Sequence, residues 1–72
     1  MEENENVYKE VYVVFDLIEN MYVRYLNLYE DNAYTLKLNL AQEFRTEIDA
    51  IVECKETELS CFRVDKIYVL EY

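Results

Sequence analysis

The chain has 72 residues, of which sixteen are acidic, seven are basic and none is histidine, and its formal net charge at pH 7 is −9. Hydrophobic residues make up 53% of the chain and eight residues are tyrosine, which excludes a disordered acidic tail because such segments have few aromatic residues. The absence of glycine excludes the glycine-rich loops that cradle nucleotide phosphates, and the negative charge predicts repulsion from nucleic acid and from anionic membranes.

Residues 1–6 are polar and acidic, and we expect them to form a flexible N-terminal segment. No break in composition follows, so residues 7–72 are predicted to form a single domain. Val7 to Asp16 is dense in valine, tyrosine and phenylalanine, which favour the pleated surface of a β-strand. The first predicted element is therefore a strand over these residues.

The next two segments are typical of a hairpin. Met21 to Tyr29 has the same strand-forming composition, and residues 30–33 (EDNA) form a turn signal. From Tyr34 to Leu40, leucine alternates with polar residues, as on a strand with one buried face. These patterns predict two antiparallel strands joined by the turn.

One long helix from Val11 to Tyr29 is an alternative for part of this region. Apolar residues recur there at helical spacing: Val14, Leu17, Ile18, Met21, Tyr22, Tyr25, Leu26 and Tyr29. Valine and tyrosine are mediocre helix formers, and Val13, Val23 and Leu28 would fall on the polar face of this helix. The composition therefore favours strands.

A helix is predicted in the second half of the chain. Thr46-Glu47-Ile48-Asp49 is similar to a capping box, and the helix is expected to run to about Glu58. The residues predicted on its apolar side, and the residue packed at its entrance, are Ile48, Ile51, Val52, Lys55, Leu59 and Phe44. Phe62 to Leu70 has the composition of a final strand. The predicted fold is α+β, an antiparallel sheet in the order β-β-β-α-β with one helix on one face.

The sequence argues against an enzyme and against a bound cofactor or metal ion. No histidine is present to act as a base near neutral pH, and Ser60, the only serine, has no obvious base beside it. Six residues separate Cys54 from Cys61, which is not a CxxC spacing, and we expect both to be buried, reduced thiols. No apolar run is long enough to cross a membrane and no signal peptide is recognisable, which favours a cytoplasmic protein.

Acidic side chains of the predicted helix form the main candidate site. Asp49, Glu53 and Glu56 gather opposite its predicted apolar side, and Asp49 and Glu53 are separated by about 6 Å along the axis, close to the spacing of successive phosphates. Acids near the predicted turns extend the pattern: Glu30, Asp31, Asp16 and Glu19. Two interpretations stay open: a solvated surface, or a substitute for phosphates that binds a basic nucleic-acid-binding protein.

The tyrosines are too numerous for the core of so small a domain. Tyrosine is enriched among the residues that dominate protein interfaces. Tyr25 and Tyr29, next to the predicted turn, are therefore candidate partner-binding residues together with Glu30 and Asp31. The surplus of apolar and aromatic surface on one small chain predicts a homodimer.

Small size, acidity, many tyrosines and the lack of glycine and proline together resemble the host-takeover proteins of phages, among them anti-CRISPR proteins and phage inhibitors of uracil-DNA glycosylase. The resemblance runs from Val11 to Leu70 and comprises a Tyr/Val hairpin, Leu40 to Thr46 (LAQEFRT), a helix containing Ala50 and a final strand. Arg63 to Ile67 (RVDKI) is similar to the end of the short dimeric glycosylase inhibitors.

The resemblance implies a class of protein, the stoichiometric inhibitors that occupy a nucleic-acid-binding site or jam an assembly, and no functional residue is transferred from these families. We therefore expect a phage-encoded inhibitor of a host DNA-targeting protein, first a CRISPR effector and second uracil-DNA glycosylase. The alternative is a non-enzymatic structural or adaptor domain that homodimerises and whose acidity serves solubility.

Overall fold

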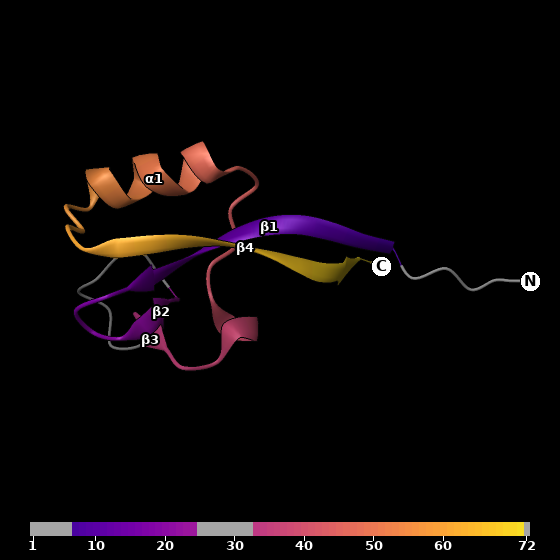
Figure 1. Cartoon of the computed structure of the whole chain (residues 1–72), viewed down its shortest axis with the longest axis horizontal. Helices are drawn as coiled ribbons and strands as arrows, with labels where there is room; N and C mark the ends of the chain where they lie inside the picture. The colour runs from indigo at the N-terminus through magenta and orange to yellow at the C-terminus, as the bar shows by residue number, and fades with distance from the viewer. Residues whose placement is uncertain (1–6, 25–32, 72) are drawn as a thin grey trace, which may run out of the picture.

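The computed structural model describes residues 7–24 and 33–71. Its elements in chain order are β1 (Val7–Asp16), β2 (Met21–Val23), β3 (Tyr34–Thr35), the 3-10 helix η1 (Leu38–Leu40), α1 (Glu47–Glu56) and β4 (Phe62–Glu71). The strands form one antiparallel sheet in the order β3-β2-β1-β4, and α1 lies against one face of it (Figure 1). The predicted α+β fold is confirmed.

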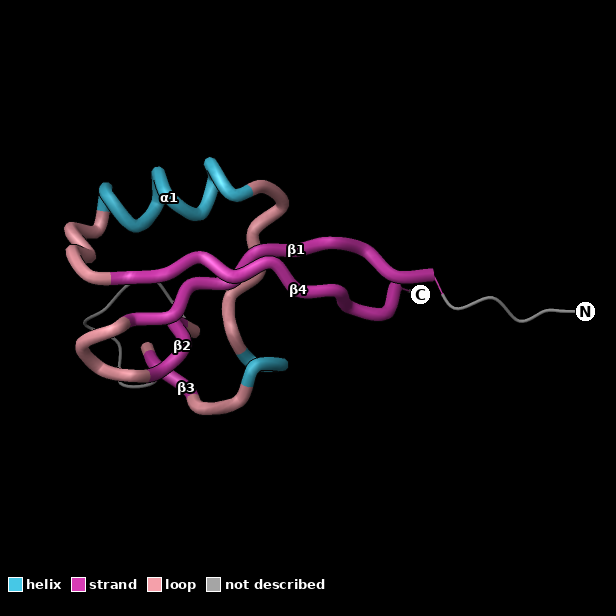
Figure 2. Tube along the Cα trace, viewed as in Figure 1, coloured by secondary structure: helices cyan, strands magenta, loops and turns pink. Residues whose placement is uncertain are grey.

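β1 and β4 form the longest part of the sheet. They pair over ten positions, from Val7 opposite Glu71 to Asp16 opposite Phe62, without a break in register. On β1, β2 pairs only with Phe15 and Asp16, so the first half of β1 and the second half of β4 extend away from the rest of the fold (Figure 2). We call these two strands, residues 7–16 and 62–71, the β1–β4 ribbon.

The predicted strand from Tyr34 to Leu40 is wrong after Thr35. The hydroxyl of Thr35 accepts a hydrogen bond from the backbone N–H of Lys37 at 3.0 Å, and the chain then turns into η1. This local bond competes with sheet pairing, as side chains of this type do in turns. Leu36, predicted on the buried face, is 77% exposed.

The N-terminal region also decides between the two sequence interpretations. β1 is a strand and residues 17–20 form a turn, so the single helix from Val11 to Tyr29 is wrong. β2 begins at Met21, as predicted, and is described as a strand to Val23. The rest of the predicted second strand and most of the predicted turn fall in residues 25–32, outside the described residues.

The core lies between α1 and one face of the sheet. The main cluster there has the buried residues Val14, Val23, Phe44, Ala50 and Cys54, and Tyr12, Tyr34, Leu59, Phe62 and Val64 pack around them. Val11 and Val13 are also buried, on the opposite face of β1. The large side chains in this cluster come from the sheet and the loops, whereas α1 contributes the small Ala50 and Cys54. Small residues let the helix lie close to the sheet.

This packing corrects the predicted apolar side of α1. Ile48 is 71% exposed and Val52 is 45% exposed, while Ala50 and Cys54 are fully buried. The helix is therefore turned so that its small residues face the sheet. Cys54 and Cys61 are both free thiols, and Cys61 is exposed, so the expectation that both are buried is wrong for Cys61.

Asp16 is a charged residue buried at the end of β1. It is 3% exposed, and its carboxylate accepts hydrogen bonds from the backbone N–H groups of Ile18 at 2.8 Å and Glu19 at 3.2 Å. The hydroxyl of Tyr34 donates a third bond at 2.9 Å. These donors fix the turn between β1 and β2 and join it to β3, so Asp16 cannot extend an exposed acidic surface as the sequence analysis suggested.

The Tyr34 hydroxyl is expected to make stability depend on pH in the alkaline range. Burial, and then the bond to Asp16, raise the pKa of Tyr34 from 10.0 to about 12. Between these values the unfolded chain binds fewer protons than the folded chain, so the free energy of unfolding falls as pH rises. Below pH 10.0, the pKa of Tyr34 in the unfolded chain, the stabilising contribution of the Tyr34 hydroxyl is fully present.

Urea unfolding at about pH 9 and about pH 11.5 measures this effect when the natural chain is compared with Tyr34→Phe. The stability difference between the two proteins should shrink at the higher pH, because phenylalanine does not titrate. An equal difference at both pH values would contradict the assignment.

α1 ends in a Schellman motif without glycine. The N–H of Leu59 donates to the carbonyl of Cys54 at 2.9 Å, and the N–H of Glu58 donates to that of Lys55 at 3.1 Å. This pattern places a left-handed residue after the helix, and Glu58 has φ of 63°. Asn20 takes the same conformation in the turn after β1, with φ of 61°.

Glu58→Gly is expected to stabilise the protein by about 0.5 to 1 kcal/mol, because a residue with a Cβ is strained in the left-handed region. Urea unfolding measures the change. Thr57→Gly is the matched control: Thr57 has φ of −93° and its hydroxyl donates to helix carbonyls, so glycine there should destabilise. A loss of stability in Glu58→Gly would contradict the prediction.

Candidate functional site

The N-terminus of α1 is fixed by its own sequence. Thr46 is the N-cap, and its hydroxyl accepts a hydrogen bond from the backbone N–H of Asp49 at 3.1 Å, as the predicted capping box requires. Glu47 and Asp49 lie in the first turn, near the positive end of the helix dipole. The bond at the cap leaves the Asp49 carboxylate available at the surface, because the backbone of Asp49 is the donor.

A groove runs between α1 and the segment that leads into it. It has a volume of about 430 Å³ and is lined by Gln42, Glu43, Phe44, Arg45, Asp49, Val52 and Glu53. Two of the three helix acids predicted as partner-binding residues, Asp49 and Glu53, therefore lie on one groove with the carboxylate of Glu43. We call this site the acidic groove.

Glu56 is exposed and lies one turn beyond Glu53, outside the acidic groove. At 100° per residue it points to the same flank of α1 as Asp49 and Glu53, so it continues their row along the helix. The predicted row on α1 is thus present, with Ile48 and Val52 exposed beside it rather than buried opposite it.

The acids of this row have no basic partner among the described residues. Ion pairs between described residues join Arg63 to Asp65 at 2.8 Å and Lys66 to Glu10 at 3.9 Å, and both lie on the β1–β4 ribbon. Lys55, the only basic residue of α1, falls on the other flank of the helix. Like charges at positions 49 and 53 cost about 0.2 to 0.5 kcal/mol of helix stability. The row is therefore not explained by helix stability.

The other predicted partner-binding residues, Tyr25, Tyr29, Glu30 and Asp31, lie outside the described residues. Sequence reasoning missed Glu43 and Arg45, which complete the groove. Glu43 and Arg45 lie within three residues before the N-cap Thr46. The chain at these positions runs close to the first turn of the helix. The capping box was therefore a signal that could have found them.

Two observations on the described residues bear on nucleophile and metal chemistry. Burial, followed by the charges of Glu53 and Asp16, raises the pKa of the Cys54 thiol to about 11, so its reactive thiolate is not formed at neutral pH. Within residues 7–24 and 33–71, no three His, Cys, Asp or Glu side chains are placed to hold a metal ion. No helix in this part of the chain has the length and apolar character that crossing a membrane requires.

Comparisons of the chain with protein-family models, with curated protein sequences and with solved structures found no match.

Proposed function

We propose that this protein is a small acidic inhibitor, phage-encoded, that binds a DNA-targeting protein in the host cytoplasm by nucleic-acid mimicry. The targets we propose are a CRISPR effector first and uracil-DNA glycosylase second. The observation that carries the proposal is the row of unpaired carboxylates on α1, with Glu43 across the acidic groove. The activity is stoichiometric binding and not catalysis.

The placement of these acids supports mimicry over a purely solvating role. Asp49, Glu53 and Glu56 follow one flank of α1 at helical spacing, whereas the ion pairs between described residues are on the β1–β4 ribbon. Other exposed acids, Glu19, Glu47 and Glu58, lie singly away from this row. The helix is capped and is anchored by Ala50 and Cys54, so the backbone positions that carry these acids are held at a fixed spacing. A backbone that is already ordered lowers the entropy cost of binding.

The apolar residues beside the row add to this argument. Ile48 and Val52 are exposed next to Asp49 and Glu53. A protein mimic can add contacts from aliphatic side chains beside the charges, which the phosphate backbone that it replaces does not carry. Charge would speed the encounter, and the apolar contacts would slow dissociation.

A competition experiment tests the proposal. The protein is immobilised and exposed to a CRISPR effector loaded with its guide RNA, and separately to uracil-DNA glycosylase. We expect one of them to bind and to be released by an excess of its duplex DNA substrate, with an affinity that falls steeply as salt rises, because exposed charges are screened within about 10 Å at 0.1 M. Binding that DNA does not displace would contradict mimicry.

The alternative function is the homodimeric structural or adaptor domain. It is favoured by the exposed apolar residues at the free end of the β1–β4 ribbon, among them Val7, Tyr8, Tyr68 and Leu70. This alternative predicts no salt-sensitive binding to either target and no competition with DNA. The same experiment therefore separates the two functions.

A further inference from the structure

β4 is the last strand of the sheet, and its outer edge has no strand neighbour among the described residues. The backbone groups on this edge follow from the ladder with β1. Leu17 donates its N–H to the carbonyl of Cys61 at 3.0 Å, which extends the ladder by one pair and identifies the odd-numbered residues of β4 as those bonded to β1. Tyr12 agrees, since its N–H and carbonyl point away from β4 and bond Phe44 at 2.9 and 2.8 Å.

The even-numbered residues of β4 therefore direct their N–H and carbonyl groups to the free edge. These residues are Phe62, Val64, Lys66, Tyr68 and Leu70. β4 contains no proline, and its register with β1 has no bulge, so two common devices that block the addition of a strand are absent from it. An unpaired edge of this length is a template for another strand.

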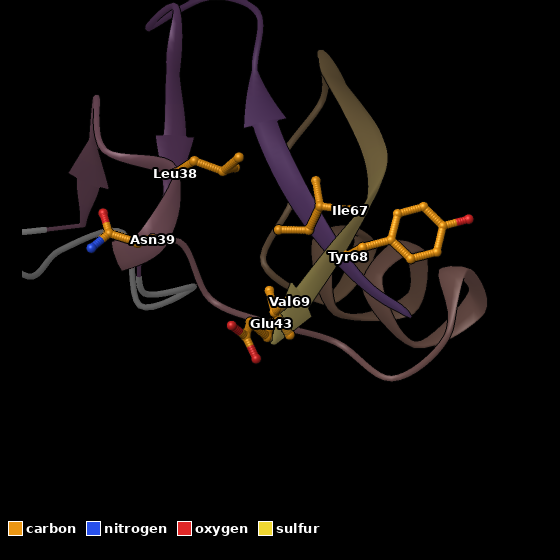
Figure 3. A pocket seen from close by; sticks show the side chains of 6 residues that line it. All are labelled: Leu38, Asn39, Glu43, Ile67, Tyr68 and Val69. Carbon is orange, nitrogen blue, oxygen red and sulfur yellow. The ribbon is translucent and has the colours of Figure 1, made fainter. Parts of the chain in front are cut away.

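Apolar surface lies on both faces of the ribbon beside this edge. On the face away from α1, a hollow of about 430 Å³ lies between η1 and β4, and it is lined by Leu38, Asn39, Glu43, Ile67, Tyr68 and Val69 (Figure 3). Figure 3 also shows the ring of Tyr68 pointing away from Leu38, toward the other side of the strand. There Tyr68 is 61% exposed and Leu70 is 43% exposed.

We propose that the free edge of β4 pairs antiparallel with β4 of a second copy of this chain, with the two-fold axis at Ile67. The free N–H and carbonyl groups of the two β4 edges must face each other. An even-numbered residue of one copy must therefore pair with an even-numbered residue of the other. A register centred on Asp65 places that carboxylate opposite itself, and one centred on Lys66 places that ammonium opposite itself. Like charges directly opposite each other destabilise a sheet.

The register centred on Ile67 avoids both repulsions. It places Lys66 opposite Tyr68 of the second copy, Val64 opposite Leu70, and Ile67 opposite itself at the edge of the apolar hollow. A register centred on Tyr68 places Asp65 opposite Glu71 of the second copy, and it pairs two fewer residues. The second copy therefore covers exposed apolar side chains of β4, Tyr68 and Leu70, and satisfies the free edge in a single arrangement.

The two-fold axis of such a pair is perpendicular to the joined sheet, so both α1 helices lie on the same face. The dimer does not depend on the inhibitor function, because it uses the β1–β4 ribbon and leaves the acidic groove outside the interface. It would present two acidic grooves to one side of the assembly.

A cysteine placed on the axis tests the register. In a Cys61→Ser background, Ile67→Cys should form an intermolecular disulfide on mild oxidation, because Cα atoms in such a non-hydrogen-bonded pair are about 4.5 Å apart, within disulfide range. Asp65→Cys and Val69→Cys in the same background are the matched controls, and neither lies opposite itself. Non-reducing gels measure the crosslinked fraction, and light scattering of the natural chain should give twice the 8.8 kDa chain mass.

A natural chain that is monomeric at high micromolar concentration would overturn the proposal, as would a dimer that crosslinks through position 65 or 69 in preference to 67.

A second pair of variants tests the same axis without oxidation. Ile67→Glu and Ile67→Lys should each be monomeric alone, and mixing them should restore a dimer, because the proposed register places opposite charges face to face. Far-UV circular dichroism confirms that each variant is folded. Failure of the folded mixture to associate would count against the axis.

Discussion

Asp16→Ala is expected to lower the free energy of unfolding by about 3 to 5 kcal/mol. Alanine removes a carboxylate that accepts three hydrogen bonds, two from the backbone of the turn and one from the hydroxyl of Tyr34. These donors would lose their acceptor in a site that is almost closed to water. A hydrogen bond to a charged group contributes about 1.5 to 3 kcal/mol, so the loss of three is severe even with partial compensation by water.

A domain of this size has a total stability of about 4 to 10 kcal/mol, so Asp16→Ala removes much of it. Urea unfolding followed by circular dichroism measures the loss. Asp16→Asn is the control, because its amide oxygen keeps one acceptor, and it should cost less than Asp16→Ala. A double-mutant cycle with Tyr34→Phe isolates the bond between the two side chains. A loss below about 1 kcal/mol in Asp16→Ala would show that this carboxylate does not hold the turn.

The role of Asp16 explains what could and could not be predicted from the sequence. Val7–Asp16 and Phe62–Glu71 are long runs of strand-forming residues, and their ends were predicted to within one residue. The start of α1 was also predictable, since a cap depends on neighbours in sequence. Asp16, in contrast, bonds a hydroxyl eighteen positions away, and no local pattern distinguishes such an acid from an exposed one.

The buried side of α1 shows a second limit. Hydrophobicity alone selects Ile48 and Val52 for the core, yet the helix buries Ala50 and Cys54. The choice depends on how much space the sheet residues Val14 and Phe62 leave beneath the helix, which is a property of the assembled fold. The acids of α1 could be placed on one flank from periodicity. Their groove also needs Glu43 from the preceding loop, which helical periodicity does not place.

Neutralising the acidic row is expected to weaken target binding by an order of magnitude or more, about 1.4 kcal/mol or beyond. The variant combines Asp49→Asn, Glu53→Gln and Glu56→Gln, which keep the shapes of the side chains and remove their charges. Folding should be intact or slightly more stable, because like-charge repulsion along the helix is relieved and the Thr46 cap uses the backbone of Asp49. The dissociation constant for the target, measured at low and at high salt, gives the loss.

The matched control removes the same number of charges elsewhere, by Glu10→Gln, Glu19→Gln and Asp65→Asn on the sheet and its first turn. Both variants have the same net charge, so a long-range effect of net charge would weaken them equally. Mimicry predicts a loss confined to the helix variant, together with a weaker dependence of its affinity on salt, since fewer carboxylates remain to contact the basic cleft. Equal affinity of the two variants would mean that α1 carries only a solvated surface. The contacts with the target would then have to come from other residues, with the exposed tyrosines of the β1–β4 ribbon as the next to replace.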